Sequence, residues 1–137
     1  MHVKEAMNPH ADVINCEHTV QEAAQKMLRG DYGSLPVERD DKMVGMITDR
    51  DIVIRVVAQG LDPAKTKVET CMTEGISYCY DDDDLAVVGQ EMITGKIRRL
   101  PVINRKKRLV GMLSLGDIAN KGQNKNLSHD ILSHVSH

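Results

Sequence analysis

Apolar residues recur with the period of an α-helix in two stretches of the chain. In VQEAAQKML (20–28) they stand at i, i+3 and i+4, along one helical face. Thr19 precedes this stretch, and Thr19 with Glu22 has the spacing of a capping box, in which each side chain binds the other residue's backbone N–H. The second stretch, LAVVGQEMI (85–93), follows Asp84, another residue type that caps helices well. The pattern therefore predicts two helices that begin at these caps.

Two short apolar runs follow each of these helices, and a charged turn joins the two runs of each pair. Such pairs of runs predict β-hairpins. A short extended stretch precedes each predicted helix, and a second helix follows each hairpin, at Thr48 and at Ser114. The predicted strands are 12–16, 34–37, 43–47, 76–80, 99–103 and 109–113. The segment 61–70, which carries Pro63 and several Lys residues, is expected to be a loop.

The chain repeats itself. The triplet LPV occurs twice, with Pro36 and Pro101 separated by 101 − 36 = 65 positions. The triplet VGM also occurs twice, with Gly45 and Gly111 separated by 111 − 45 = 66 positions. The extra residue falls in the charged turn, where an insertion does least harm to a hairpin. A constant offset over several markers indicates an internal duplication.

Each repeat has the predicted order β-α-β-β-α. A unit of about 65 residues buries too little surface to be robust alone, so we expect two pseudo-twofold-related halves that bury each other's apolar faces, sheet to sheet. The predicted fold class is α/β (α+β). The expected divisions are residues 1–62 for the first unit, 63–121 for the second, and 122–137 for a C-terminal tail or helix.

Composition and charge exclude several classes of function. Aromatic residues make up 2% of the chain, with no Phe or Trp, so the core must be aliphatic and base-stacking platforms for nucleic acids are not expected. The net charge of −2 provides no basic field for DNA or RNA. No apolar run approaches the ~20 residues of a membrane span. We therefore expect neither a nucleic acid nor a membrane as partner.

Three cysteines, Cys16, Cys71 and Cys79, make an odd and irregular set, which does not indicate a disulfide framework. We expect a reduced, cytoplasmic protein. With His10 and His18 the same cysteines raise the alternative of a zinc site, but their spacing is not that of a zinc finger or ribbon, and no metal is expected. In the tail, one helical stripe and three histidines suggest a frayed helix or a dimer contact rather than a metal site. These residues are Leu127, Ile131 and Val135, and His129, His134 and His137.

The repeated motifs resemble those of a tandem cystathionine β-synthase (CBS) domain pair. They are a Met, then TVQEAAQKM, LPV and VGMITDRDI in the first half, and a Met, then DLAVVGQEM, LPV and VGMLSLGDI in the second. The resemblance covers nearly the whole chain, roughly residues 3–121. It implies paired β-α-β-β-α units, frequent assembly into a homodimer, and adenosyl ligands such as AMP, ADP, ATP, NAD or S-adenosylmethionine. It also implies a regulatory role without catalysis, in which the ligand changes the packing that an effector protein reads.

The residues at the start of each second helix suit a nucleotide. A helix N-terminus carries unpaired N–H donors and partial positive charge, so Thr48 and Ser114 stand where a phosphate is favoured. Asp51 and Asp117 follow three residues later, one helical turn away, and a carboxylate there accepts hydrogen bonds from a ribose diol. In CBS pairs the matching residues contact phosphate and ribose. The alternative is helix capping alone, for which the same residue types are common.

The resemblance implies further ligand contacts around these motifs. Adenine is expected against the backbone before each LP pair, and the other half is expected to complete each cleft. His18 and Ala23 are accordingly assigned to the Ser114/Asp117 cleft, and Asp83 and Val88 to the Thr48/Asp51 cleft. The residues expected near adenine are Tyr32, Gly33 and Pro36 in the first half, and Ile97, Arg98 and Pro101 in the second.

The two clefts are expected to differ in charge. The acidic run 81–84 is assigned to the Thr48/Asp51 cleft, where it would repel a polyphosphate. Arg98, Arg99 and the basic run 105–108 are assigned to the other cleft. The hypothesis is that the Ser114/Asp117 cleft is the better phosphate site. The alternative for the acidic run is a solvated stretch before a helix.

Two other classes of function compete with a ligand sensor. An enzyme is disfavoured because the chain has no Gly-rich P-loop and no nucleophile elbow. A dimerisation or scaffold module with degenerate clefts stays open as the alternative. Binding of adenine nucleotides separates a sensor from a scaffold.

Overall fold

The computed structural model describes residues 1–121, and they form two compact units. One, called the N-half unit, is Asp12–Ile76. The other, called the C-half unit, combines Met1–Ala11 with residues 77–121 of the described chain. The predictions for residues 122–137 lie outside the described residues.

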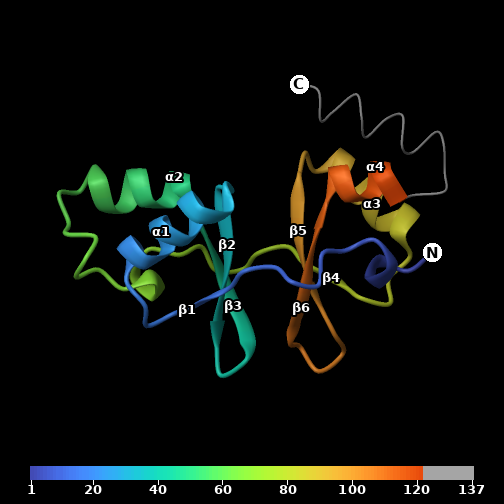
Figure 1. The fold of residues 1–137 in the computed structure, drawn as a ribbon, viewed down its shortest axis with the longest axis horizontal. Coiled ribbons are helices and arrows are strands. Elements are labelled where there is room, and N and C mark those ends of the chain that lie inside the picture. Colours follow the sequence, from blue (N-terminus) through green and yellow to red (C-terminus); the bar gives the residue numbers. More distant parts are fainter. Residues whose placement is uncertain (122–137) are drawn as a thin grey trace. The chain divides into compact units, whose positions relative to one another are not determined.

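The N-half unit contains a three-stranded sheet with two helices that pack beside each other (Figure 1). Strand β1 runs parallel to β2, and β2 runs antiparallel to β3. Helix α2 continues directly into a π-helical stretch, Val53–Val57, so the predicted second helix is present but changes its hydrogen-bond pattern. A short 3₁₀ turn comprises Val68–Thr70. The other elements are β1 (Ile14–Asn15), α1 (Val20–Gly30), β2 (Ser34–Arg39), β3 (Lys42–Thr48) and α2 (Asp49–Ile52).

The C-half unit repeats this plan (Figure 1). Strand β4 is parallel to β5, β5 is antiparallel to β6, and α3 packs beside α4. A 3₁₀ turn, Val3–Glu5, comes from the start of the chain. The elements are β4 (Cys79–Tyr80), α3 (Leu85–Thr94), β5 (Arg99–Ile103), β6 (Leu109–Ser114) and α4 (Leu115–Lys121). The predicted order β-α-β-β-α and the α/β (α+β) class are confirmed in both units.

The cores are aliphatic, as the composition predicts. Leu35 and Pro36 in β2, and Leu100 and Pro101 in β5, are buried, which explains the repeated LPV triplets. The side chains that form the N-half core include Ile14, Val20, Ala23, Leu35, Val37, Ile47, Val56 and Val68. Those that form the C-half core include Val3, Ala6, Leu85, Val88, Met92, Leu100, Val102, Leu113 and Ile118.

The compact units differ from the sequence repeats at their edges. Val3 and Ala6, at the start of the first repeat, are fully buried in the C-half core. Val68, at the start of the second repeat, is fully buried in the N-half core. The sequence predicts only a loop for the segment 61–70, and its end is instead a 3₁₀ turn that buries Val68. The pattern misses this turn because a single apolar residue among polar ones carries no periodic signal.

The repeated VGM triplets have a steric reason. A Cβ on Gly45 would lie 2.8 Å from the carbonyl oxygen of Thr73 and 2.9 Å from Sδ of Met72. A Cβ on Gly111 would lie 2.7 Å from the carbonyl oxygen of Asn8 and 2.8 Å from Sδ of Met7. A segment that begins with a repeated Met therefore crosses each hairpin, and glycine leaves the room for it.

Candidate functional site

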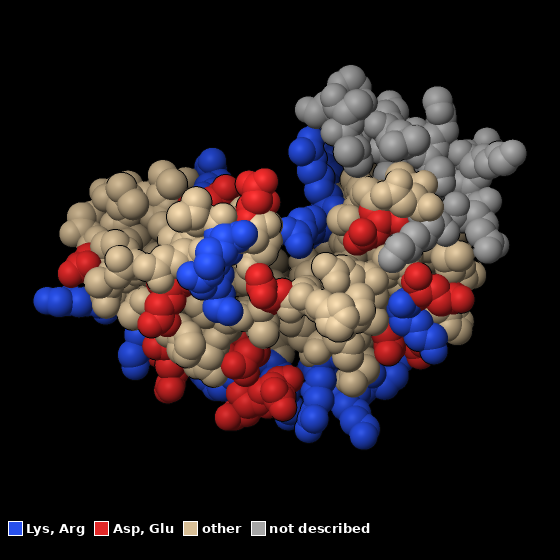
Figure 2. Space-filling view, viewed as in Figure 1, with Lys and Arg blue, Asp and Glu red and all other residues tan. Residues whose placement is uncertain are grey.

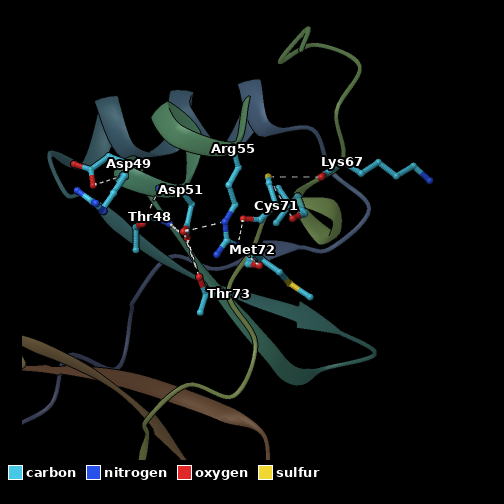
Figure 3. A network of polar contacts seen from close by, with 10 residues as sticks. Thr48, Asp49, Asp51, Arg55, Lys67, Cys71, Met72 and Thr73 are labelled. Carbon is cyan, nitrogen blue, oxygen red and sulfur yellow. Dashed lines mark hydrogen bonds and ion pairs between the residues drawn. The ribbon is translucent and has the colours of Figure 1, made fainter. Parts of the chain in front are cut away.

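Thr48 and Asp51 form a reciprocal cap at the start of α2 (Figure 3). The Thr48 hydroxyl accepts a hydrogen bond from the Asp51 backbone N–H at 3.0 Å. The Asp51 carboxylate accepts one from the Thr48 backbone N–H, also at 3.0 Å. This is a capping box, and it satisfies two N–H groups that the helix leaves without partners. The capping interpretation is therefore correct for this motif, and it leaves the hydroxyl proton of Thr48 available to donate to a ligand.

Asp51 is also the only charged residue that is buried in the described part of the chain, at 9% exposure. Thr73 donates its hydroxyl hydrogen bond to this carboxylate, 3.2 Å from Oδ1 and 3.4 Å from Oδ2. Arg55 lies one helical turn beyond, with Nε 4.0 Å from Oδ1. The partners of Asp51 therefore come from the end of β3, from the π-helical stretch and from the segment after Cys71 (Figure 3).

Ser114 and Asp117 form the same reciprocal pair at the start of α4. The Ser114 hydroxyl accepts from the Asp117 backbone N–H at 2.9 Å, and the Asp117 carboxylate accepts from the Ser114 backbone N–H at 3.1 Å. Both residues are partly exposed, whereas Asp51 is buried. The two motifs thus share their cap and differ in how accessible the carboxylate is.

The residues predicted before each LP pair do lie beside these caps. Gly33 accepts a backbone hydrogen bond from Asp49 at 2.9 Å, directly after the Thr48 cap. Arg98 accepts the equivalent bond from Leu115 at 3.0 Å, directly after the Ser114 cap. The antiparallel register joins the same places, because Ser34 pairs with Thr48 and Arg99 pairs with Ser114. Each unit therefore brings its Thr/Ser-x-x-Asp motif to the start of its middle strand.

Other predicted contacts take varied positions. Tyr32 donates a hydrogen bond from its hydroxyl to Asp12 at 2.5 Å. Pro36 and Pro101 are buried opposite Met46 and Met112 in their hairpins. Ile97 packs at the edge of the C-half core.

The residues assigned across the two halves are described only within their own units. His18 is exposed and pairs with Glu22, with Nδ1 2.9 Å from the carboxylate. Asp83 caps a turn by accepting from the Tyr80 backbone N–H at 2.9 Å. Ala23 and Val88 are core residues, at 0% and 3% exposure. Their roles toward a ligand stay predictions.

The charge assignment of the second cleft is wrong for the basic run 105–108. This run forms the turn of the β5–β6 hairpin, whereas Ser114 lies at the other end of β6. At about 3.3 Å per residue, five residue steps separate Leu109 from Ser114 by roughly 17 Å. Only Arg98 and Arg99 of the predicted cations lie at the Ser114 end. Nearness along the chain misleads in this case, because an extended strand carries its two ends far apart.

The basic turn meets the acidic run within the same unit. Arg105 binds Asp82 through two guanidinium nitrogens, at 2.8 and 3.1 Å from Oδ1, and lies 3.8 Å from Asp83. The hydrogen bonds from Arg105 lower the pKa of Asp82. Arg105 also stacks 4.0 Å from the centroid of the Tyr80 ring, and a hydrogen bond from Lys107 lowers the pKa of Tyr80. The acidic run is thus partly neutralised by its own unit, and Figure 2 shows acidic and basic side chains interspersed over the face in view.

A small cavity of about 160 Å³ lies beside Arg98 in the C-half unit. Its volume is below the roughly 300 Å³ at which ligand pockets begin, so it suits only part of a ligand. Lys96 is one of the residues that line this cavity. The sequence pattern does not predict this, because a lone Lys after a helix is usually solvated. The lining residues are Met92, Ile93, Lys96, Arg98 and Leu115.

No group of three or more His, Cys, Asp or Glu side chains suited to a metal occurs within residues 1–121. Cys16, Cys71 and Cys79 are all free and buried. Burial raises the pKa of Cys71, and it raises that of Cys79 to about 12. Within the same residues, no helix combines the length and the apolar character needed to span a bilayer.

Two β-α-β-β-α units with duplicated caps define a tandem-repeat α/β protein, and comparison with known proteins identifies its family. The CBS domain profile matches residues 3–58 and 68–123. The chain belongs to the CBS domain family. The resemblance inferred from the repeated motifs is therefore confirmed.

Relatives of similar length support the assignment. The chain is 33% identical over 135 residues to the CBS domain-containing protein YhcV of Bacillus subtilis, and the match covers 98% of this chain and 95% of that protein. It is 36% identical over 117 residues to hypoxic response protein 1 of Mycobacterium tuberculosis, covering 85% of this chain and 81% of the relative. The crystal structure of hypoxic response protein I, which has two coordinated zinc ions, superposes with a TM-score of 0.78 at 34% identity, covering 88% of this chain and 98% of that one.

Solved structures similar to this chain include a complex with adenosyl ligands. The CBS domain pair of MJ0100, in complex with 5′-methylthioadenosine and S-adenosyl-L-methionine, superposes with a TM-score of 0.72 at 26% identity. The match covers 88% of this chain and 94% of that pair. CBS pairs of this kind are in general regulatory modules rather than catalysts.

Proposed function

We propose that this protein is a regulatory sensor of adenosyl ligands, with no catalysis of its own. The observation that carries the proposal is the duplicated Thr/Ser-x-x-Asp cap beside the backbone of the residue that precedes each central strand. The adenosyl ligands of the MJ0100 pair add support from a relative with the same fold. The ligand is AMP, ADP, ATP, NAD or S-adenosylmethionine, and it acts by shifting the conformation or the dimer that an effector protein reads.

In this proposal each residue has a defined task. The hydroxyls of Thr48 and Ser114 donate to a phosphate or to another polar 5′ substituent, and Asp51 or Asp117 accepts from the ribose hydroxyls. Adenine lies against the backbone of Gly33 or Arg98. The remaining contacts in the proposed sites are Tyr32, Pro36, Ile97, Pro101, His18, Ala23, Asp83 and Val88. A reducing compartment such as the cytoplasm suits the three free cysteines.

Ligand-dependent stabilisation tests the proposal. The thermal midpoint is expected to rise with at least one of AMP, ATP, NAD, S-adenosylmethionine and 5′-methylthioadenosine, because a ligand at 100 times its Kd stabilises by about 2.7 kcal/mol. GMP at the same concentration is the control for nonspecific effects of a nucleotide. Absence of a shift with every adenosyl ligand would refute the sensor, and turnover of a bound nucleotide would indicate an enzyme.

The alternative is a dimerisation or scaffold module that binds no ligand, and one surface favours the dimer. The exposed face of the α2 region is apolar, at 42–64% exposure per residue, although solvent would favour polar side chains there. We propose that a second copy of the chain covers this face in a homodimer. Light scattering should give twice the 15.3 kDa chain mass, and Val57→Asp should return it to the monomer value. The residues of this face are Val53, Ile54, Val57 and Leu61.

A further inference from the structure

The Asp51 carboxylate has more partners than a helix cap needs. Besides the Thr48 N–H at 3.0 Å, it accepts the Thr73 hydroxyl hydrogen, with Oγ1 3.2 Å from Oδ1, and it faces the Arg55 guanidinium at 4.0 Å. Burial of a carboxylate is costly unless such partners replace its water. A ribose diol that binds here would compete with Thr73 for the same two oxygen atoms.

These partners fasten a particular segment. Arg55 Nη1 donates to the carbonyl oxygens of Cys71 at 3.0 Å and Met72 at 2.9 Å (Figure 3). The next residue, Thr73, exchanges two backbone hydrogen bonds with Met46, at 2.8 and 2.9 Å. Asp51 thus joins α2 to the segment that leads out of the N-half unit.

The second motif lacks this arrangement. Asn8 takes the position of Thr73 in the repeat (73 − 8 = 65), and it makes the same backbone pair with Met112, at 2.8 and 3.0 Å. Its side-chain oxygen Oδ1 accepts a hydrogen bond from the His10 N–H at 3.0 Å. In the described part of the chain, the Asp117 carboxylate accepts only the Ser114 N–H, through Oδ2. Its Oδ1 therefore has no donor there.

We infer that the two motifs have different tasks. Asp51 is a structural carboxylate that holds the segment 71–73, and Asp117 is the carboxylate that accepts the two hydroxyls of a ribose. The inference rests on the proposed function and names which motif binds. The preference for the Ser114/Asp117 motif rests on the hydrogen-bond partners of the two carboxylates. It does not rest on the charge pattern, because the basic run 105–108 lies at the opposite end of the hairpin from Ser114.

Matched Asp→Asn variants separate the two tasks. Calorimetric titration with AMP and urea unfolding are carried out on D51N and D117N. D117N is expected to bind AMP at least about tenfold more weakly, because hydrogen bonds to a charged group are lost. Its urea midpoint stays close to wild type, because the amide oxygen of Asn still accepts from the Ser114 N–H. D51N is expected to lower the urea midpoint and to weaken AMP binding less than D117N does. Equal losses of AMP affinity in both variants would overturn the inference.

A milder variant covers the case in which D51N does not fold. Thr73→Val removes one hydroxyl and keeps Asp51, and it should lower the urea midpoint while leaving AMP binding intact. Thr94→Val, an exposed position at the end of α3, is the control and should change neither. If T73V matches T94V in stability, Asp51 has no structural task through Thr73. If wild type binds no adenosyl ligand, the proposed function and the task of Asp117 both fail, whereas the T73V midpoint still decides the task of Asp51.

Discussion

At the scale of single residues, the repeated glycines are visible in the sequence, but the structural reason for them is not. Gly45 and Gly111 are visible in the sequence as parts of the VGM triplets. Their reason is the backbone of a distant segment, since the carbonyl oxygens of Thr73 and Asn8 stand within 3 Å of the missing Cβ positions. No local pattern predicts such a crossing, because the two partners are about 30 or 100 residues away along the chain.

Substitution of Gly45 tests this close approach. Gly45→Ala should lower the free energy of unfolding by about 2 kcal/mol, because the nearest obstacle is backbone and moves only with the segment that it belongs to. Gly116→Ala is the control: its Cβ would have an ordinary contact of 3.7 Å with Ser114, and Ala in a helix is favoured over Gly by up to about 1 kcal/mol. Urea unfolding measures both. A G45A variant as stable as G116A would contradict the steric explanation.

The buried thiol of Cys79 should make the protein less stable at alkaline pH. Burial raises its pKa from 9.0 to about 12, so the folded state holds the thiol proton after the unfolded state has released it. The stabilisation is therefore fully present below about pH 9 and is lost as the pH rises toward 12, at no more than about 1.4 kcal/mol per pH unit. Unfolding free energies of wild type and Cys79→Ala from pH 8 to pH 10.5 should show a steeper decline in wild type. Parallel declines would contradict the assignment.

The cap residues show how much of the candidate site can be predicted from local sequence alone. The Thr/Ser-x-x-Asp spacing predicts both reciprocal caps because all of its atoms lie within one helical turn. The additional partners of Asp51 divide into two kinds. Arg55, at i+4, is within reach of sequence reasoning, since this spacing places two side chains on one face. Thr73 is not, because its approach depends on the fold of the whole unit.

At the scale of elements, α1 begins as predicted but with half of the predicted capping box. The Thr19 hydroxyl accepts from the Glu22 N–H at 3.2 Å. The Glu22 side chain does not return to Thr19, and it pairs with His18 at 2.9 Å instead. An i, i+4 partner thus competes with the cap, which a motif that considers only two residues does not anticipate.

Thr19→Ala measures the remaining half of this cap. The substitution should lower the free energy of unfolding by about 1 kcal/mol, because the Glu22 N–H loses its acceptor at the start of α1. Gln21→Ala, at an exposed position in the same turn, is the control and should change stability little. Chemical denaturation compares the two. Equal stability of the two variants would show that solvent replaces the cap without cost.

At the scale of the whole molecule, the compact units do not follow the order of the repeats. The sequence shows the duplication clearly, because the offset holds over most of the chain. It does not show that the first segment of each repeat packs in the core of the other repeat's unit, as Val3 and Val68 do. A repeat pattern shows which segments are equivalent, but either copy of an equivalent segment would fit a given core. Which copy packs in which core is therefore seen only in the folded chain.

Val3 and Val68 occupy equivalent positions (68 − 3 = 65), and both are 0% exposed, so they provide a matched test of this exchange. Each Val→Ala substitution removes two buried methyl groups and should lower stability by about 2 kcal/mol. Hydrogen exchange locates the loss. Val3→Ala should weaken amide protection in 79–115, and Val68→Ala should weaken it in 14–57, because each residue packs in that core. If Val3→Ala instead weakened protection in 14–57, the first segment would belong to its own repeat.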